Sequence, residues 1–409
     1  MTKLLRRWQL KKIKEVLKSR RVVVISGARQ IGKTTLAQQV ATAKDSFVTL
    51  DNSAILASVL DDPLGFVRHA KGTMIIDEIQ KAPSLILAIK QVVDANNRAG
   101  QFLLTGSADI RTLPAISDSL AGRISHIRLR GLTVGEALEV KPTFLSRSFQ
   151  KDWPFQITGY DKRAVIKLAF RGGYPEVVNL PNAQHRGWFI DYVKSLLSRD
   201  LRDIANIQRH DAMEELLNIL GAWSSKFMDA GTICSKLAIS RNTFNSYLNA
   251  LISLCLFEKV PAWLRTDYER VGRKEKIFAT DTGLMANLLN WRQEEVLFDA
   301  DRAGKVVETL VFNELIAQLD LDYGYSLFHY RDREDREIDF IVENDRAELL
   351  GIEVKSGSMV SKNDCRHLVW FKKNIVKDRH FVGIVLYSGE ITLSLGEDMY
   401  AVPIAVLWS

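Results

Sequence analysis

Apolar and polar positions alternate along the first third of the chain in a way that predicts strands separated by helices. Four apolar runs bounded by polar residues are typical of buried strands: VVVIS, FVTLD, TMIIDEIQ and QFLLTGSAD. The stretch TTLAQQVA after the first run has helical spacing, and a second helical stretch continues to Asp62 before the break at Pro63. Strands that alternate with helices predict a three-layer α/β core over residues 22–140.

The turn after the first strand has the spacing of a phosphate-binding loop. GARQIGKT places two glycines around four residues and then Gly-Lys-Thr, between a strand and a helix. Backbone N–H groups at a helix N-terminus favour negative charge, so we expect the phosphates of ATP to lie against this loop. Lys33 is expected to reach the β and γ phosphates, and the Thr34 hydroxyl to bind Mg²⁺. The residues expected to surround the nucleotide are Gly27, Ala28, Arg29, Gln30, Ile31, Gly32, Lys33, Thr34 and Thr35.

Further polar residues follow the later strands, at the edge where parallel sheets bind ligands. Asp77 and Glu78 end an apolar strand as a Walker B pair. Asp77 is expected to hold the Mg²⁺ shell, and Glu78 to orient or deprotonate the attacking water. Ser107 is the expected γ-phosphate sensor, with a plain Thr-Gly-Ser turn as the alternative. Arg123 is a candidate for stabilising transition-state charge, in cis or from a neighbouring subunit, with a structural salt bridge as the alternative.

Three short helical patterns follow over about residues 213–256. They read MEELLNILGAWSS, AGTICSKLAIS and RNTFNSYLNALISLCLF, with turn and N-cap residues between them. This order predicts a helix-turn-helix, and the basic run YERVGRKEKIF is a candidate wing. The candidate DNA contacts are Arg241, Asn242, Thr243 and Asn245 on the third helix, and Arg270, Arg273, Lys274 and Lys276 in the wing. The same pattern also suits a protein-docking or lid module.

The last region carries a second set of charged residues. Glu308 lies in the helical stretch GKVVETLVFNELIAQL and Asp339 in the strand EIDFIV, while Glu353 and Lys355 share one face of the strand LLGIEVKSG. This is the arrangement of a restriction-endonuclease-like, PD-(D/E)xK core. Asp339 and Glu353 would share Mg²⁺ or Mn²⁺, Lys355 would orient or activate the water, and Glu308 would support the site. The alternative is a degenerate fold in which Lys355 only neutralises Asp339 or Glu353 and the domain binds without cleaving.

Composition and charge narrow the class of protein. The 409 residues are 46% hydrophobic, which suffices for several domains of about 100–200 residues each. With no long apolar run and no signal peptide pattern, we expect a cytoplasmic protein that makes no membrane contact. Cys234, Cys255 and Cys365 lack metal or disulfide spacing and are expected to be buried thiols.

The net charge of +7 is concentrated at the start of the chain, where Glu15 is the only acidic residue among the first 44. Such a basic arm suits DNA phosphates or an acidic protein surface. A solvated basic helix is the alternative.

These motifs together resemble a known family. GARQIGKTTL, MIIDEIQ, LLTGSAD and SLAGR are similar to prokaryotic AAA-plus-type ATPases that carry a C-terminal region long catalogued as a domain of unknown function. The resemblance continues through RGGYPEVV, YVKSLLSRDL, KEKIFATDTGL, VVETLVFNEL, YRDREDREIDFIVE and GIEVKSG, so it spans nearly the whole chain. It implies a nucleotide-dependent ATPase and is compatible with an ATP-regulated nuclease. The Asp281-Thr282-Gly283 sequence within it is expected to form a structural turn.

We therefore expect a multidomain α/β protein. The predicted parts are a basic N-terminal helix (1–21), a P-loop ATPase core (22–140), a helical linker or lid (141–210), a winged-helix-like domain (211–290) and a restriction-endonuclease-like domain (291–409). The predicted function is Mg²⁺-dependent ATP hydrolysis coupled to DNA binding, with metal-dependent DNA cleavage as a further step. The alternative is an ATP-gated DNA-binding or protein-interaction switch with a non-cleaving clamp. Either function is compatible with a homo-oligomer.

Overall fold

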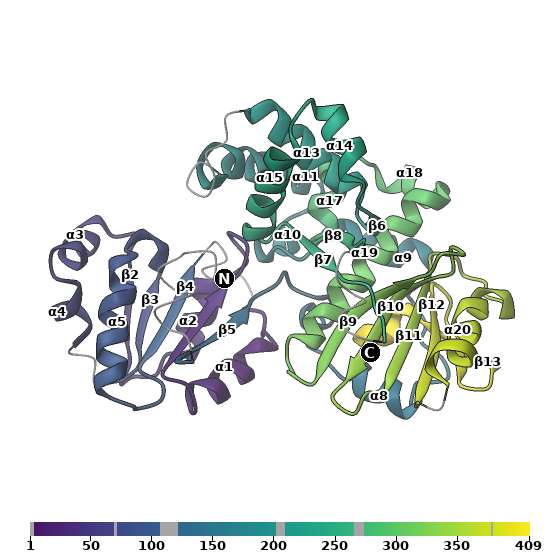
Figure 1. Ribbon diagram of the computed structural model, residues 1–409, viewed down its shortest axis with the longest axis horizontal. Coiled ribbons are helices and arrows are strands. Elements are labelled where there is room, and N and C mark those ends of the chain that lie inside the picture. The colour runs from purple at the N-terminus through teal and green to yellow at the C-terminus, as the bar shows by residue number, and fades with distance from the viewer. Residues whose placement is uncertain (1–3, 69–71, 107–121, 202–208, 266–273, 378) are drawn as a thin grey trace. The chain divides into compact units, whose positions relative to one another are not determined.

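A computed structural model of the chain describes residues 4–68, 72–106, 122–201, 209–265, 274–377 and 379–409 (Figure 1). The described residues form two compact units. The first contains residues 4–131 with Ile252–Leu256, and the second contains Leu132–Leu251 with Phe257–Ser409. Each unit has its own sheet or sheets and its own buried core.

A five-stranded parallel sheet in the order β2-β3-β4-β1-β5 forms the centre of the first unit. Its strands are β1 (Val22–Ser26), β2 (Ser46–Thr49), β3 (Met74–Asp77), β4 (Phe102–Gly106) and β5 (Ile124–Arg128). The register pairs Ser26 with Gly106 on one side and with Arg128 on the other. Because every pair is parallel, the carboxyl ends of the strands meet at one edge, where Asp77 also lies. The α/β core predicted from the alternating pattern is confirmed.

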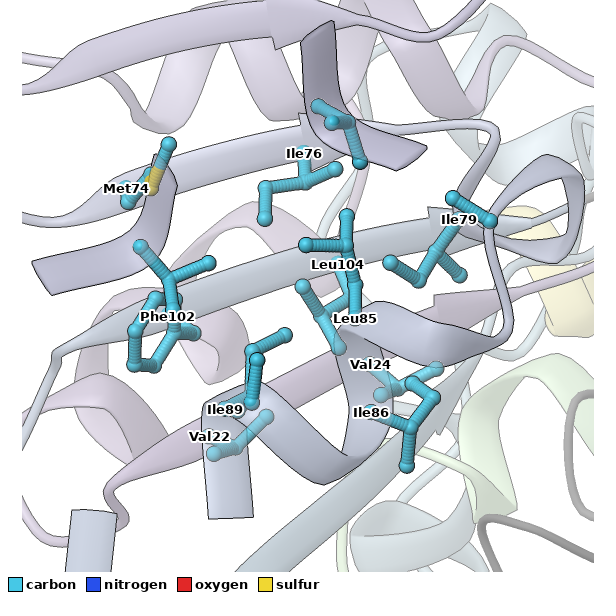
Figure 2. Packing of buried hydrophobic residues seen from close by; sticks show 14 of the residues in the cluster. Val22, Val24, Met74, Ile76, Ile79, Leu85, Ile86, Ile89, Phe102 and Leu104 are labelled. Atoms are coloured by element: carbon cyan, nitrogen blue, oxygen red, sulfur yellow. The ribbon is translucent and has the colours of Figure 1, made fainter. Parts of the chain in front are cut away.

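Helices cover this sheet. They are α1 (Gln9–Leu17), α2 (Lys33–Val40), α3 (Ser53–Asp61), α4 (Pro63–Arg68), the 3-10 turn η1 (Ile79–Lys81) and α5 (Ser84–Ala95). Figure 2 shows Leu85, Ile86 and Ile89 of α5 beside Phe102 and Leu104 of β4, all of them buried in one hydrophobic cluster. Truncating Ile89 to alanine would cost about 2–5 kcal/mol in the free energy of unfolding. This packing holds β4 and β3 in place, and these strands carry the polar residues at the sheet edge.

Short helices open the second unit. They are α7 (Val134–Ala137), α8 (Phe144–Gln150), α9 (Lys162–Arg171), α10 (Pro175–Asn179), α11 (Asn182–Ser195) and the π-helix η3 (Leu196–Asp200). Thr133 begins α7 with a capping box, because its hydroxyl accepts from the Glu136 N–H and the Glu136 carboxylate accepts from the Thr133 N–H.

Three helices and a small antiparallel sheet come next, in the order α13 (His210–Ala222), β6 (Lys226–Phe227), α14 (Ala230–Leu237), α15 (Arg241–Ser253), β7 (Phe257–Val260) and β8 (Lys276–Ala279). The sheet order is β6-β8-β7, so β8 has a partner on each side. Asp229 caps α14 by accepting from the N–H groups of Gly231 and Thr232. Ser240 accepts from the Thr243 N–H at the start of α15.

The rest of the second unit is a mixed six-stranded sheet with helices around it. Its helices include α17 (Thr282–Leu288), α18 (Gln293–Phe298), α19 (Ala300–Leu319), η4 (Lys362–Cys365), α20 (Arg366–Phe371), η5 (Lys372–Val376) and η6 (Ile404–Trp408). Its strands are β9 (Tyr325–Arg331), β10 (Glu337–Asn344), β11 (Leu349–Lys355), β12 (Phe381–Tyr387), β13 (Leu393–Gly396) and β14 (Met399–Pro403), in the order β13-β14-β12-β11-β10-β9. The buried ring of Phe312 stacks on those of Phe278 and Phe340, and the three rings join β8, α19 and β10.

Two of the motifs in the sequence meet inside the second unit. Buried Asp281 caps α17 by accepting from the N–H of Leu284. Its other carboxylate oxygen accepts from the N–H of Gly173, which lies in RGGYPEVV. A Cβ on Gly172 would lie 2.6 Å from the Asp281 carboxylate, so glycine is needed there. This packing agrees with a structural role for the turn at Asp281. Nearby, the carboxylate of Glu314 on α19 accepts from the Val134 N–H.

In the part of the chain that the structure describes, no helix is both long enough and apolar enough to span a bilayer.

Candidate functional site

The loop between β1 and α2 requires glycine at both of its ends. A Cβ on Gly27 would lie 2.3 Å from the backbone oxygen of Leu129, which is too close for any side chain. Gly32 has a φ of 94° at the N-cap of α2, a left-handed conformation that glycine adopts without strain. Gln30 and Thr35 are exposed, whereas Ala28 and Ile31 are buried. The glycine spacing read from the sequence therefore has a geometric cause on each side of the loop.

Lys33 lies at the first position of α2, and its side chain turns back into the loop. Its Nζ donates to the backbone oxygens of Gly27 at 3.1 Å and Ala28 at 2.8 Å, and the residue is only 5% exposed. Burial lowers the pKa of Lys33, against the attraction of the Glu78 and Asp77 carboxylates, which raises it. The loop thus holds a buried ammonium at its centre, where the sequence predicts the phosphates of ATP.

Thr34 and Asp77 lie side by side at the sheet edge. The Thr34 hydroxyl donates to both carboxylate oxygens of Asp77, at 3.1 and 3.0 Å. A hydroxyl and a carboxylate are hard oxygen donors that fit Mg²⁺, which usually takes one or two protein ligands and fills its other positions with phosphate oxygens and water. Asp77 is buried at the end of β3, so its charge is directed toward this edge.

Thr105, at the end of β4, connects the two Walker B residues. Its hydroxyl donates to the Asp77 carboxylate and accepts from the Glu78 N–H at 3.3 Å, and the residue is fully buried. Glu78 adopts a φ of 59°, which is unusual for a residue other than glycine and is typical of strained functional positions. The Gln80 side chain donates to the Glu78 carboxylate. Sequence reasoning did not assign Thr105 a role.

Ser107, the predicted sensor, lies outside the residues that the structure describes. The signal for Thr105 was its place as the last side chain of an otherwise apolar strand, directly beside the predicted Walker B strand. A polar side chain buried at such a position needs a partner, and the Asp77 carboxylate supplies it.

Arg123 lies at the other end of the sheet. Its backbone oxygen accepts from the N–H of Val22, the first residue of β1, whereas the loop follows the last residue of that strand. The full length of β1, at about 3.3 Å per residue, therefore separates Arg123 from the phosphate-binding loop. Its guanidinium forms an ion pair with Asp94 of α5 instead. This placement contradicts a role for Arg123 in cis, while a role across a subunit interface stays a prediction.

The basic N-terminal arm contributes one residue to the loop. The guanidinium of Arg7 donates to the backbone oxygens of Ile31 at 3.1 Å and Arg130 at 2.5 Å, and the residue is buried. Arg6, Lys11 and Lys14 are exposed, as expected for a solvated arm. Arg7 thus joins the tip of the loop to the segment that follows β5.

In the second unit, the predicted C-terminal residues meet in one cluster that also contains two residues that sequence reasoning missed. Asp339 and Glu337 lie on β10 two residues apart, Glu353 lies on the paired strand β11, and Glu308 lies on α19. The Nζ of Lys276 lies 3.0 Å from Glu308 Oε1, 2.6 Å from Glu337 Oε1 and 3.2 Å from Asp339 Oδ1. The other Asp339 oxygen accepts from the Val354 N–H at 2.9 Å. Lys355 is partly exposed, with its Nζ 3.7 Å from Glu353 Oε2.

Lys276 was predicted to lie on an exposed wing, and that prediction is wrong. Its side chain is only 1% exposed and faces the carboxylates. Although burial opposes the charged form, Glu308, Asp339 and Glu337 raise the pKa of Lys276 well above its usual value. Two features of the sequence could have indicated the positions of Lys276 and Glu337. Lys276 lies inside the apolar strand KIFA, and Glu337 alternates with Asp339 on one face of β10.

The carboxylates show the opposite effect of burial. Burial and the nearby Asp339 charge raise the pKa of Glu308 to about 7, against the attraction of Lys276. The same two causes raise the pKa of Glu353 well above its usual value. On β9, burial and the nearby Lys276 charge lower the pKa of His329 to about 4, so this imidazole is neutral at pH 7. The cluster is thus a buried ionic network with Lys276 at its centre.

This arrangement does not fit a divalent metal. Glu308, Asp339 and Glu353 have the right chemistry, but the ammonium of Lys276 already contacts the Glu308 and Asp339 oxygens that a metal would need. Within the described ranges, no group of three or more His, Cys, Asp or Glu side chains is arranged to hold a metal ion. We therefore derive no cleavage step from this cluster.

On α15, three of the candidate DNA contacts are available at the surface. Arg241, Asn242 and Asn245 are exposed at the start of the helix, and Thr243 is half-buried with its hydroxyl bonded to Ser240. Lys274 is exposed, and Arg270 and Arg273 fall outside the described residues. Of the three cysteines, Cys255 and Cys365 are buried as expected, whereas Cys234 is partly exposed.

Three known families match consecutive parts of the chain. Residues 19–138 match the AAA domain, residues 162–295 match a domain of unknown function (DUF8612), and residues 303–407 match another (DUF4143). The first unit carries a P-loop AAA-type ATPase domain. In the second unit, Lys276 falls in one matched region, whereas Glu308, Glu337, Asp339 and Glu353 fall in the next.

Uncharacterized proteins of Mycobacterium bovis and Mycobacterium tuberculosis are each 26% identical to this chain over 384 residues, which are 93% of this chain and 80% of theirs. Among solved structures, AMPPCP-bound DnaA from Aquifex aeolicus is 14% identical to this chain, with a TM-score of 0.30. The match covers 60% of this chain and 85% of the DnaA chain. A signal transduction ATPase with numerous domains and a tetratricopeptide repeat sensor, from Pyrococcus horikoshii, is 16% identical, with coverages of 78% and 47% and a TM-score of 0.22. These TM-scores are too low to support a conclusion about the fold.

Proposed function

We propose that the AAA-type domain binds ATP with Mg²⁺ and hydrolyses it. The observation that carries this proposal is the contact between the Thr34 hydroxyl and the Asp77 carboxylate, next to the loop that holds the buried Lys33 ammonium. Lys33 would bind phosphate oxygens, and Thr34 and Asp77 would hold Mg²⁺, which neutralises phosphate charge when bound. Glu78 would orient the attacking water or accept its proton.

The test compares ATP binding with ATP hydrolysis in the full chain. Lys33→Ala is expected to lose both, whereas Glu78→Gln is expected to keep binding and to lose hydrolysis by about 10²–10⁴-fold. Lys81→Ala is a matched control, because Lys81 is exposed in the same segment and pairs only with Asp51 among the contacts described. Unchanged hydrolysis in Lys33→Ala or Glu78→Gln would contradict the proposal.

We infer further that the described residues 210–265 and 274–279 belong to a winged helix that contacts DNA through the start of α15. The order of helices and strands and the sheet order β6-β8-β7 support this inference. So does the exposed set of Arg241, Asn242 and Asn245, whose side chains suit phosphate and base contacts. The competing function is protein docking by the same face.

Fluorescence anisotropy with a DNA duplex at several salt concentrations tests this inference. Arg241→Ala is expected to weaken binding and to reduce the slope of log K against log salt by about 1, because one phosphate contact is lost. Lys167→Ala, an exposed lysine on α9, should leave both unchanged. Affinity that ignores salt, or an equal effect of both variants, would favour docking of a protein partner.

The two proposals combine in an ATP-gated DNA-binding switch. In such a switch, nucleotide in the AAA-type domain changes DNA affinity by a coupling factor, commonly about 5–150-fold. Comparing the DNA affinity without nucleotide, with ADP and with a non-hydrolysable ATP analogue gives that factor. Lys33→Ala should remove the difference, and equal affinities in all three states of the unaltered protein would contradict coupling.

A further inference from the structure

The C-terminal cluster already contains a cation, and that cation belongs to the chain itself. The Lys276 ammonium lies within 3.2 Å of carboxylate oxygens from Glu308, Glu337 and Asp339, on α19 and β10. These distances are ordinary for charge-assisted hydrogen bonds, and they use all three N–H donors of a lysine. The ammonium is therefore fully engaged by the cluster.

The backbone fixes Lys276 in this position. It lies on β8, the middle strand of its sheet, and its backbone pairs with Phe227 on one side and with Val260 on the other. The Phe227 ring lies beside the side chain, with its centroid 5.6 Å from Nζ. Withdrawing the ammonium would remove the cation that Glu308 and Asp339 contact inside the fold, which carries a high free-energy cost, whereas Glu337 would keep Arg331, whose Nη1 lies 4.0 Å from Glu337 Oε2.

A fourth carboxyl group in the cluster has one oxygen that the ammonium does not contact. Glu353 Oε1 is buried and has no hydrogen-bond partner among the described residues, and Glu353 is 93% buried in total. Its other oxygen lies 3.7 Å from the Nζ of Lys355. Buried polar oxygens are usually hydrogen-bonded, so the unpartnered Glu353 Oε1 calls for an explanation, and a ligand position left unfilled beside the ammonium supplies one.

We propose that Lys276 takes the place of a divalent metal in this cluster, so that the cluster holds no catalytic metal and does not cleave nucleic acid. Replacing Lys276 with an uncharged side chain of similar length would then create a divalent-cation site from Glu308, Asp339 and Glu353. The proposal rests on the second unit alone and is independent of ATP hydrolysis by the first.

Binding of Mn²⁺ to the full chain tests the proposal, measured by electron paramagnetic resonance and calorimetry without nucleotide. An Asp77→Asn background removes the carboxylate of the AAA-type site, so that any remaining ion belongs to the second unit. In this background, the protein that keeps Lys276 should show no saturable Mn²⁺ binding, and Lys276→Arg should show none either. Lys276→Met should bind one Mn²⁺ per chain, and adding Glu353→Gln should abolish that binding.

The opposite results would overturn the proposal. The protein that keeps Lys276 could bind Mn²⁺ saturably and lose that binding in Asp339→Asn, which would refute the proposal. Mn²⁺-dependent plasmid cleavage that is lost in Asp339→Asn would also refute it. A folded Lys276→Met variant that binds no Mn²⁺ would show that the ammonium does not occupy a metal position. If Lys276→Met fails to fold, thermal unfolding of the Lys276 protein decides: Mn²⁺ should leave its Tm unchanged, and an increase that Asp339→Asn removes would refute the proposal.

Discussion

Thr105→Val replaces one hydroxyl with a methyl group at the point where the two Walker B residues are joined. The valine has nearly the same shape, so the packing of β4 should survive. Two hydrogen bonds are lost: the one donated to the Asp77 carboxylate and the one accepted from the Glu78 N–H. The carboxylate keeps the Thr34 hydroxyl as a donor, but its orientation is no longer fixed from the β4 side.

The size of the effect follows from the kind of bond. A buried hydrogen bond to a charged group contributes about 1.5–3 kcal/mol, and each 1.4 kcal/mol is a factor of ten. If that energy serves to orient Asp77 and Glu78 for hydrolysis, kcat should fall by about 10- to 100-fold. The free energy of unfolding should fall by a similar 1.5–3 kcal/mol, because the Glu78 N–H loses its acceptor and the Asp77 carboxylate loses one of its two hydroxyl donors.

The assay measures ATP hydrolysis as a function of Mg²⁺ concentration, together with urea unfolding. Thr105→Ser is the matched control, because it keeps the hydroxyl and loses only a methyl group, and its Mg²⁺ dependence should stay near that of the unaltered protein. Thr105→Val should need more Mg²⁺ and turn over more slowly. Normal hydrolysis and Mg²⁺ dependence in Thr105→Val would refute the reasoning, even if the variant is less stable.

Three further predictions follow from buried groups. Burial raises the pKa of Glu314 to about 8, so the unfolded chain loses this proton near pH 4.5 while the folded chain keeps it. The free energy of unfolding should therefore fall as pH rises between these values, by on the order of 5 kcal/mol. Glu314→Gln should remove this pH dependence of the free energy of unfolding, measured by urea unfolding. Arg7→Lys removes the fork that holds Ile31 and Arg130 and should weaken nucleotide affinity by about tenfold, measured by titration, whereas Arg6→Lys should not. Gly27→Ala should abolish nucleotide binding without unfolding the chain, as measured by titration and circular dichroism, because its Cβ meets a backbone oxygen at 2.3 Å.

The geometry of the loop and of the sheet edge beside it could be predicted because its determinants are local. A strand, a loop and a helix within a few turns of chain are enough to place Lys33 and Thr34, and parallel strands bring Asp77 to the same edge. The error at Arg123 arose because β5 was not recognised as a strand in the sequence, so the edge of the sheet at which Arg123 lies could not be predicted. Arg123 precedes β5, so the parallel register puts it at the amino edge beside Val22. Once Ile124–Arg128 is known to be a strand, the cis role for Arg123 is excluded.

The acidic cluster was only half predictable, for a different reason. Alternation on β10 and β11 brings Asp339 and Glu353 together, and these strands are neighbours both in the chain and in the sheet. Lys276 is separated from Glu308 by 32 positions and from Asp339 by 63, so no spacing rule links them. In the sequence it stands in a basic run, where charge alone suggests a surface. Tertiary packing decides instead, since β8 turns this one lysine of the run inward.

The position of Lys276 also bears on where DNA could bind. A bound divalent metal would bring two positive charges and draw a phosphate to the cluster, and it would lower the pKa of a bound water. A lysine brings one charge, and its three donors are already used by Glu308, Glu337 and Asp339, so it offers a phosphate nothing. With Glu353 as a further carboxylate, the cluster is a poor place for a DNA backbone even when part of its charge is neutralised by protons. Any DNA contact by this unit is therefore expected at another surface, such as the exposed start of α15, whose side chains suit phosphate and base contacts.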